Sequence, residues 1–413
     1  LYRMTPLKVV CIGGGTGLST LLRGIKQYVA SNGGGCRTFD MDQLTAIVSV
    51  SDDGGSSGRL IDEFGVLPPG DIRNCLVALA NEDEMMSQLF EYRFDSEGDL
   101  QGHSVGNLLL IALMDMQGTF PSAIQEASKV LAVRGRILPV TLDATVLCAE
   151  LVNGSIVRGE SAIPDRTDRS PIKHVFLARR AENGGRATPC DEADHPEPIR
   201  ALPEAAEAIR DADAVIIGPG SLFTSILPNI AVPEILAALQ ESSAIKIYVA
   251  NVMVEPGETD AYTLTDHVGA IQRHGSVPID YVLANSQRAS EELVQQYHQA
   301  ELQQTYHWLS AARNKGDSTD NGAFLSFDDF VREASKPGSG VPGAPGRPRV
   351  QVLHRPDADN VAPAELVEDD LIAEEEIRER DATIRVLRHD SSKLAAAIVR
   401  LLRRHYNGDA LSV

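Results

Sequence analysis

Cysteine, aromatic residues and positive charge are all scarce in this sequence. The five cysteines lie far apart and none forms a CxxC pair, so we expect reduced thiols rather than a disulfide framework or a zinc site. Lysine and arginine total 38 against 58 aspartates and glutamates, and no basic cluster carries interleaved aromatic residues. A net charge of −20 repels a polyphosphate backbone, and we therefore expect no nucleic-acid partner.

Long hydrophobic runs are also absent. No stretch approaches the roughly 18 consecutive apolar residues that a membrane-spanning helix requires. The N-terminus lacks a positively charged segment followed by an apolar secretory stretch. These absences lead us to expect a cytoplasmic protein without membrane insertion.

The sequence does contain a repeated order of apolar strand, polar loop and apolar-periodic helix. Residues 7–12 precede GGGTGLS, and similar strands at 45–50, 214–217 and 246–250 precede SDDGGSSG, GPGS and Asn251. Near-continuous apolar strands alternating with helices predict a Rossmann-like, doubly wound α/β fold with a mostly parallel sheet, helices on both faces and surface insertions. Ligands of such sheets bind beyond the carboxyl ends of the strands.

The distribution of glycine, proline and charge predicts the domain organisation. We expect a nucleotide-binding α/β domain over residues 1–313, with insertions near 31–43 and 179–197. A flexible Pro/Gly-rich insertion is expected over 314–349, followed by a segment over 350–413 that returns to the same domain.

Within that last segment, the acidic run over residues 365–381 is typical of a solvated helix face. Strands are expected at 349–353 and 383–387, and an amphipathic helix at 391–404.

Two glycine-rich loops are candidates for holding a phosphate, because glycine lacks a Cβ and lets backbone amides approach an anion. The first loop lacks the GK[ST] ending of a Walker loop, and Leu18 occupies the place of the third glycine of GxGxxG. A tight turn that serves only strand-to-helix packing is the alternative. The expected ligand contacts in the two loops are Gly14, Gly15, Thr16, Gly17, Gly218, Gly220 and Ser221.

Paired carboxylates follow the second of these strands. Asp52 and Asp53 would lie at the ligand crevice, where they could hold Mg²⁺ or accept hydrogen bonds from sugar hydroxyls. The alternative is a turn in which one aspartate caps a helix. Farther along, Asp71 follows a Pro-Gly turn, and we expect it to be the N-cap of the next helix.

Three asparagines are further candidates for ligand contacts. Asn74 lies in the first helical turn of PPGDIRNCLVALA, where a ligand contact and a purely structural role are equally supported. Asn107, in GHSVGNLLL, carries an amide that can both donate to and accept from a base or sugar. Asn251 follows a predicted strand and faces the crevice by position. The neighbouring His103 is more typical of a structural histidine.

Taken together and in this order, GGGTGLS, VSDDGGSSGRL, PPGDIRNCLVALA, GHSVGNLLL, IGPGSLFTSILPN, PGETDAYTLTDH and VLRHD closely resemble the YvcK family, also called the gluconeogenesis factor family. The resemblance covers most of the chain from Lys8 to Leu402. That family is related to CofD, the 2-phospho-L-lactate transferase of coenzyme F420 synthesis. Because GGSSGRL and PPGDIRN continue here in the YvcK manner, the resemblance implies the YvcK branch.

This resemblance implies a cytoplasmic factor that binds UDP-sugars such as UDP-N-acetylglucosamine and supports gluconeogenic growth and normal cell shape. By motif position, the UDP-sugar contacts of the family carry over to Tyr297 and Arg388. Arg388 suits a diphosphate, because guanidinium forms bidentate charge-assisted hydrogen bonds. Tyr297 could stack on the uracil or donate its hydroxyl.

Three functions compete for these residues. The first is a non-catalytic regulator in which nucleotide-sugar binding shifts a conformational or partner-binding equilibrium, with a regulatory protein partner and a homo-oligomeric state expected. The second is a CofD-like, Mg²⁺-dependent transferase of a phospho-acid from a nucleotide-activated donor. The third, an NAD-dependent oxidoreductase, shares the expected sheet but lacks the complete fingerprint.

Overall fold

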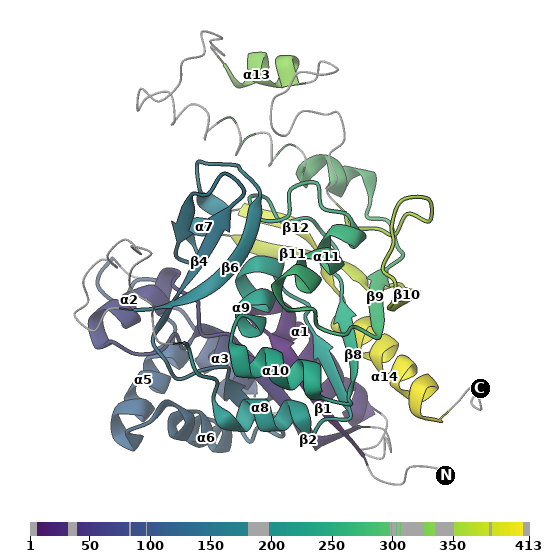
Figure 1. The fold of residues 1–413 in the computed structure, drawn as a ribbon. Coiled ribbons are helices and arrows are strands. Elements are labelled where there is room, and N and C mark those ends of the chain that lie inside the picture. Colours follow the sequence, from purple (N-terminus) through teal and green to yellow (C-terminus); the bar gives the residue numbers. More distant parts are fainter. Residues whose placement is uncertain are drawn as a thin grey trace.

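The centre of the protein is a seven-stranded sheet in which every neighbouring pair of strands is parallel (Figure 1). The predicted doubly wound α/β fold is therefore confirmed. From one edge to the other, the strands are β3 (Arg136–Pro139), β2 (Phe39–Val48), β1 (Leu7–Gly13), β7 (Ala214–Ile217), β8 (Ile245–Val249), β9 (Tyr281–Asn285) and β10 (Glu365–Asp369). The computed structural model describes residues 6–31, 39–81, 84–95, 97–180, 198–297, 299, 303, 306, 326–334, 351–379 and 382–407.

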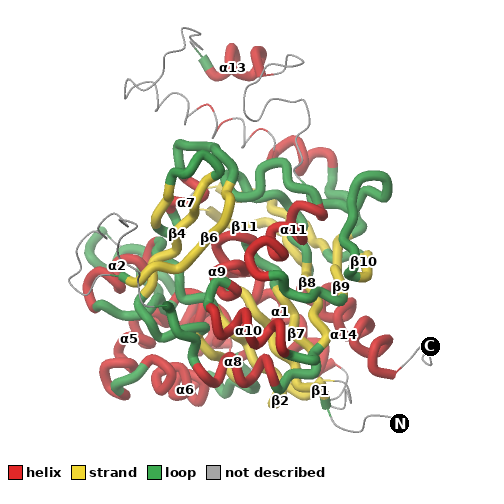
Figure 2. Tube along the Cα trace, in the orientation of Figure 1, coloured by secondary structure: helices red, strands yellow, loops and turns green. Residues whose placement is uncertain are grey.

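Alternation along the strands divides the interior into two cores. On β1, Val9 and Cys11 face one core, whereas Val10 and Ile12 face the other. Helices cover both faces of the sheet (Figure 2), which explains why its strands are apolar throughout. The first core is covered by α1 (Gly15–Ser31), α3 (Gly70–Leu79), α5 (Val105–Gln117), α6 (Phe120–Val130) and α14 (Ser391–Asn407).

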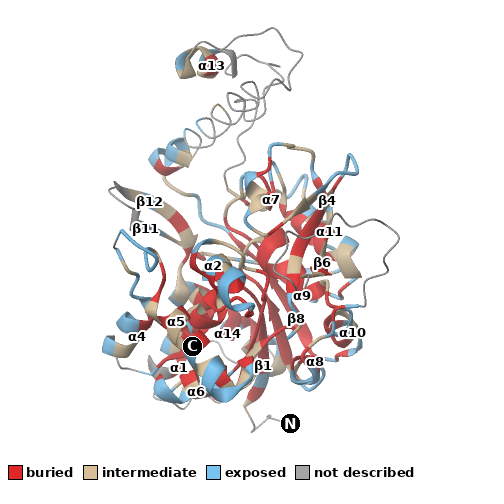
Figure 3. Cartoon of the chain, turned by 90° about the vertical axis from the view of Figure 1, so that its left-hand side faces the viewer, coloured by how far each residue is buried: buried red, intermediate tan, exposed pale blue. Residues whose placement is uncertain are grey.

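The second core lies on the opposite face and is equally closed to solvent (Figure 3). Its helices are α8 (Pro203–Arg210), the short π-helix η1 (Leu222–Ile226), α9 (Leu227–Ile230), α10 (Pro233–Glu241) and α11 (Leu264–Gly275). In the described part of the chain no single helix is long and apolar enough to span a membrane; only the bent pair 222–230 and 233–241, counted together, reaches that length and hydropathy.

Two smaller β-structures flank the main sheet near the carboxyl ends of its strands (Figure 1). One is an antiparallel sheet of β4 (Thr145–Leu151), β5 (Ile156–Arg158) and β6 (Ile172–Arg179). The other is an antiparallel hairpin of β11 (Ile372–Glu379) and β12 (Ala382–His389). The remaining helices are α2 (Gly55–Phe64), α4 (Glu84–Glu91), α7 (Ala162–Asp165) and α13 (Phe327–Ala334).

The C-terminal segment returns to the main fold. Strand β10 completes the main sheet, and α14 buries Leu394 and Ile398 in the first core. The expected strand at 383–387 is present as part of β12. At 349–353, however, the structure shows only an isolated bridge between Gln351 and Met253.

The prediction of a helix face over the acidic run 365–381 was wrong. This run forms strands β10 and β11. Strand β10 is the edge of the sheet, and its partly exposed acidic side chains suit an edge that must not pair with another chain. Strand β11 is stabilised across the hairpin by an ion pair between Glu374 and Arg385.

The expected insertions fall only partly on described residues. Residues 39–43 belong to β2 rather than to an excursion, and the rest of 31–43 beyond Ser31 lies outside the described residues. Residues 181–197 also lie outside the described residues. Of the insertion expected over 314–349, only residues 326–334, which contain α13, are described.

Candidate functional site

The strand order reverses between β1 and β7, because the chain moves from β1 toward β3 and later continues on the other side of β1. At such a switch point the loops after the two central strands diverge and leave a crevice. A cavity of about 340 Å³ occupies this position. The predicted residues that line it are Gly14, Gly15, Thr16, Gly17, Gly220, Ser221, Asn251 and Arg388.

Close approach between the two glycine loops builds one wall of this cavity. A Cβ added to Gly17 would lie 2.5 Å from the carbonyl oxygen of Pro219, and Gly15 has a positive φ of 60°. Helix α1 begins at Gly15, and Thr16 and Gly17 of its first turn line the cavity, where backbone N–H groups have no acceptor within the helix. Free amides at a helix N-terminus favour an anion such as phosphate.

The second glycine loop is held in place by side chains from neighbouring elements. Gly218 has a φ of 83° and shapes the loop, although it does not line the cavity among the described residues. Asn229 donates hydrogen bonds to Gly13 O at 3.2 Å and Ser225 O at 2.8 Å. Asn251 donates to Gly220 O at 2.9 Å, so its amide supports the loop from within the cavity wall.

Glu255 is a cavity residue that sequence reasoning missed. Its Oε1 accepts hydrogen bonds from Ser221 at 2.9 Å and Asn251 at 3.4 Å. Its Oε2 is buried and has no partner in the described part of the protein. Burial raises the pKa of this carboxyl to about 7. Near neutral pH, Glu255 therefore exchanges between a carboxylate and a carboxylic acid that can donate a hydrogen bond.

Arg388 and His389 line the cavity from β12, which is far along the chain from the two glycine loops. The guanidinium of Arg388 forms no hydrogen bond or ion pair with any described residue and is therefore free to bind an anion. His389 is only 9% exposed, and burial lowers the pKa of its imidazole to about 4.

Neutral His389 lines the same cavity and carries an unpaired ring nitrogen. The ring is hydrogen-bonded to the backbone of Ala250, whereas Nε2 has no partner among the described residues. A backbone carbonyl can only accept, so Nδ1 carries the proton and Nε2 carries a lone pair. His389 is thus suited to a hydroxyl or N–H group of a ligand. Sequence reasoning missed it, although its place beside Arg388 was a usable signal.

Tyr297 does not line the cavity but supports the strand that carries Arg388. Its hydroxyl accepts a hydrogen bond from the backbone N–H of Leu387 at 3.0 Å. The ring packs against a small cluster that contains Leu387 and Leu293. Tyr297 therefore contacts the backbone of the residue that precedes Arg388. A direct contact of the Tyr297 ring with uracil stays a prediction.

Carboxylates form a second layer around the glycine loops. Asp53 accepts hydrogen bonds from the N–H groups of Glu160 and Ser161, both at 2.9 Å, and so holds the loop between β5 and α7. Asp52 accepts from Gly54 N at 3.0 Å. Among the described residues, no group of three or more His, Cys, Asp or Glu side chains is arranged to hold a metal ion. Mg²⁺ at Asp52 and Asp53 stays a prediction.

Glu160 and Asp71 are two further acidic residues close to the first glycine loop and the cavity. Glu160 lines the cavity, and burial together with Asp52, Asp71 and Asp53 raises its pKa to about 9. Burial and the Asp52 carboxylate raise the pKa of Asp71 to about 7. The expected N-cap role of Asp71 was wrong: the N-cap of α3 is Pro69, and the carboxyl of Asp71 accepts from the N–H of Gly15.

Asn74 and Asn107 lie away from the cavity. Asn74 accepts a hydrogen bond of 2.5 Å from Arg73. Asn107 donates to Ser56 at 3.1 Å, and Ser56 in turn contacts Nδ1 of His103 at 3.0 Å. Ser56, His103 and Asn107 thus form a buried polar network between α2 and α5, and neither Asn74 nor Asn107 is part of the cavity lining.

Comparison with known proteins places the chain. Residues 9–319 match the family described as 2-phospho-L-lactate transferase CofD. The gluconeogenesis factor of Bacillus subtilis is 46% identical over 291 residues, which cover 70% of this chain and 82% of that protein. The gluconeogenesis factor of Halalkalibacterium halodurans is 41% identical over 349 residues, covering 84% and 98%.

A solved structure extends the comparison to three dimensions. An X-ray crystal structure of a Bacillus halodurans protein superposes with a TM-score of 0.70 and 36% sequence identity, covering 96% of this chain and 100% of that one. The matched family, the similar relatives and the shared fold agree with one another. The chain belongs to the gluconeogenesis factor (YvcK) family of CofD-like proteins.

Proposed function

We propose that this protein is a non-catalytic regulatory factor that binds a nucleotide sugar of the UDP-N-acetylglucosamine type in the cavity between β1 and β7. The observation that carries the proposal is the unpaired Arg388 at a cavity lined by two glycine loops and the start of α1. Backbone amides and a guanidinium are the groups that bind a diphosphate. The acceptor Nε2 of His389 would then meet a hydroxyl or amide N–H of the sugar.

The charge around the cavity adds a condition to this proposal. Glu160, Asp71 and Glu255 would repel a diphosphate if all three were ionised. Their raised pKa values allow them to be protonated near neutral pH, and a divalent cation could neutralise them at higher pH. Binding should therefore be strengthened by Mg²⁺, in keeping with the cofactor that we expect.

Relatives named gluconeogenesis factor support a role in growth on gluconeogenic carbon sources, and the family resemblance adds normal cell shape. In this proposal the protein acts in the cytoplasm through a regulatory protein partner and as a homo-oligomer. The buried free thiols of Cys11, Cys75 and Cys148 suit a reducing compartment. Sedimentation analysis, and capture of a partner with and without nucleotide sugar, test these features.

Calorimetric titration with UDP-N-acetylglucosamine, with and without Mg²⁺, tests the binding site. Arg388→Ala should weaken binding roughly 10- to 100-fold, because a hydrogen bond to a charged group contributes about 1.5–3 kcal/mol. Arg210→Ala is the matched control, because Arg210 pairs with Glu241 at 3.0 Å and lies outside the cavity. Absence of wild-type binding, or equal binding by Arg388→Ala, contradicts the proposal.

The second candidate is a CofD-like transferase, favoured by the family match over residues 9–319 and by the carboxylates beside the glycine loops. Mass spectrometry of the recovered ligand separates the two functions. Intact UDP-N-acetylglucosamine supports the regulator. A Mg²⁺-dependent phospho-acid product from a nucleotide-activated donor, lost in Asp52→Asn, would establish the transferase instead.

A further inference from the structure

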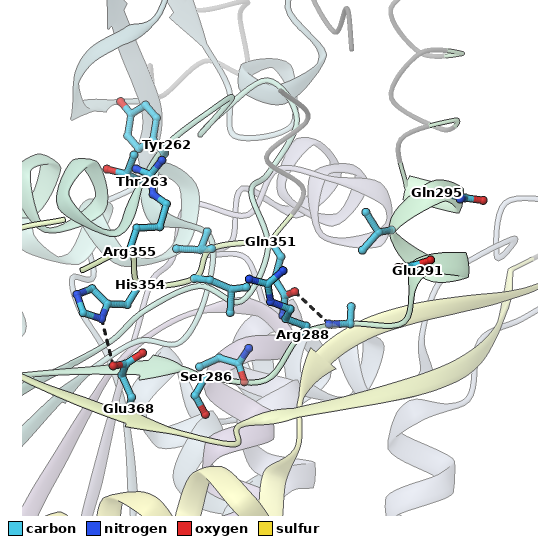
Figure 4. Close-up of a pocket in the computed structure, with 15 residues that line it drawn as sticks. Tyr262, Thr263, Ser286, Arg288, Glu291, Gln295, Gln351, His354, Arg355 and Glu368 are labelled. Atoms are coloured by element: carbon cyan, nitrogen blue, oxygen red, sulfur yellow. Dashed lines mark hydrogen bonds and ion pairs between the residues drawn. The ribbon is translucent and has the colours of Figure 1, made fainter. Parts of the chain in front are cut away.

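A second and larger cavity, of about 770 Å³, lies at the carboxyl ends of β9 and β10 (Figure 4). Its lining includes Asn285 from the end of β9, Glu368 from β10, and residues 351–355. It shares no described lining residue with the cavity between the glycine loops. Its size is within the range of about 300–1,000 Å³ that holds small organic ligands.

Two side-chain amides hold the turn that carries Arg288 at this cavity. Asn285 is 1% exposed, donates to Gln287 O at 2.7 Å and accepts from Gln287 N at 3.3 Å. Gln351 reaches the same turn from the opposite wall, donating to Gln287 O at 2.6 Å and accepting from Ala289 N at 3.1 Å. The backbone on both sides of Arg288 is thus fixed, and Figure 4 shows Arg288 beside Gln351.

Arg355 is held in a comparable way on another wall. Its backbone N–H donates to Oδ2 of Asp359 at 2.8 Å, and its Nε lies 3.5 Å from the same oxygen. Asp359 also accepts from Thr265 at the start of α11. These contacts orient the guanidinium toward Tyr262 and Thr263, as Figure 4 shows, and leave its two terminal nitrogens without a described partner.

The other polar groups of this cavity are largely engaged within the protein. The carboxylate of Glu368 lies 3.1 Å from Nδ1 of His354, and the hydroxyl of Thr263 donates a hydrogen bond to Asp266. The side-chain amides of Asn285 and Gln351 hold the turn. Glu291 is an exposed acidic residue on the surface of the helix over 291–297. The strongest groups left to meet a ligand are the two guanidinium groups. Arg288 forms no ion pair with any described residue, although acidic residues outnumber basic ones in this chain.

We propose that this cavity is a second ligand site, separate from the nucleotide site, which binds a small organic anion through Arg288 and Arg355. Two guanidinium groups on braced backbone match a ligand with two or more negative charges, since each can form bidentate hydrogen bonds to a phosphate or carboxylate. The cavity volume exceeds what a lone inorganic phosphate needs, so the ligand carries an organic part.

Calorimetric titration of the full chain with glucose 6-phosphate, citrate and inorganic phosphate tests this site, with glucose as the uncharged control. We expect glucose 6-phosphate or citrate to bind more tightly than inorganic phosphate, and glucose not to bind. The stronger of the two organic anions identifies the ligand as a phosphate ester or a polycarboxylate. Absence of binding by both organic anions overturns the proposal.

Variants locate the binding. Arg288→Ala should lower the affinity for the organic anion about tenfold or more, because the substitution removes charge-assisted hydrogen bonds. Arg388→Ala and Arg210→Ala should leave that affinity unchanged. Arg288 is exposed, so its removal should preserve folding, whereas Arg355→Ala also deprives the buried Asp359 of a partner. Wild-type anion affinity in Arg288→Ala contradicts the site.

The nucleotide site provides a separate control. Arg288→Ala should bind UDP-N-acetylglucosamine as the wild type does. If Arg288→Ala and Arg388→Ala lost affinity for the nucleotide sugar equally, both cavities would bind one ligand. That result would overturn the proposal of a separate anion site. Failure of UDP-N-acetylglucosamine to bind the wild type would contradict the proposed function alone, because the anion titration requires no nucleotide.

Discussion

The hydroxyl of Tyr297 accepts a hydrogen bond of 3.0 Å from the backbone N–H of Leu387, one residue before Arg388. Tyr297→Phe would remove this acceptor and keep the ring packed in its cluster. We expect nucleotide-sugar binding to weaken roughly fivefold, because one neutral hydrogen bond contributes about 1 kcal/mol. Calorimetric titration measures the change.

Tyr281→Phe is the matched control for this prediction, because the hydroxyl of Tyr281 contacts His405 outside both cavities. Unchanged affinity in Tyr297→Phe would show that the bond to Leu387 does not position Arg388. A loss as large as that of Arg388→Ala would show instead that Tyr297 contacts the ligand directly.

Contact between the glycine loops gives a second prediction. A Cβ on Gly17 would lie 2.5 Å from the carbonyl oxygen of Pro219 and 2.8 Å from Cα of Gly220, and neither backbone atom can rotate away. We expect Gly17→Ala to lower the free energy of unfolding by about 1–3 kcal/mol, as overpacking does, and to weaken nucleotide binding. Urea unfolding and calorimetry measure the two effects.

Gly98→Ala is the control, because a Cβ on Gly98 would meet nothing within 4 Å. If Gly17→Ala unfolded at the same urea concentration as Gly98→Ala, the loops would not be in the contact described here.

The central sheet and the glycine cavity could be predicted because their signals are local. Each strand at the switch point is apolar throughout, and its loop follows directly. One short segment therefore indicates the strand, the loop and the edge of the sheet at which a ligand is expected to bind. Arg388 was found through its motif, VLRHD. No local pattern would have placed it at the same cavity as Gly17, because that placement depends on where the β11–β12 hairpin lies relative to the sheet.

The errors have physical causes as well. Glutamates favour helices in isolation, but the run 365–381 forms strands because β10 finds a partner in β9 and β11 finds one in β12. Asp71 has the residue type of an N-cap, yet its carboxyl is drawn to the N–H of Gly15 in another loop. Glu160 arrives from a separate antiparallel sheet, and nothing in its own segment indicates that it reaches the cavity.

Ionisation near the cavity should make nucleotide binding depend on pH. Asp71 and Glu255 have pKa values raised to about 7, so both gain negative charge between pH 6 and 8. A diphosphate ester keeps its charge over this range, and we therefore expect weaker binding at pH 8 than at pH 6 without a divalent cation. Calorimetry at the two pH values, with and without Mg²⁺, measures the effect.

Mg²⁺ should reduce the difference between pH 6 and pH 8, because it offsets the added negative charge. Glu255→Gln, which cannot ionise, should also show a smaller difference than the wild type. Affinity that stays constant from pH 6 to 8 in the metal-free wild type would argue against this electrostatic account.

The raised pKa of Glu160 predicts a gain in stability on its removal. Its pKa is about 9 in the folded protein against an ordinary value of 4.5, so the folded state keeps a proton that the unfolded chain releases between these values. The unfolded state then binds fewer protons, and the free energy of unfolding falls as pH rises through this window. Glu160→Gln removes this penalty and should stabilise the protein at pH 7.5 by on the order of 1–3 kcal/mol.

Urea unfolding at pH 7.5 and pH 4 measures this gain, and the same gain should be absent at pH 4, where both states hold the proton. Glu126→Gln is the control, because Glu126 forms a surface pair with Lys129 and lies outside the cavity. Equal stability of Glu160→Gln and the wild type at pH 7.5 would mean that Glu160 is well solvated. A gain at pH 7.5 accompanied by weaker Mg²⁺-dependent nucleotide binding would show that this carboxyl is kept for its site at the expense of folding stability.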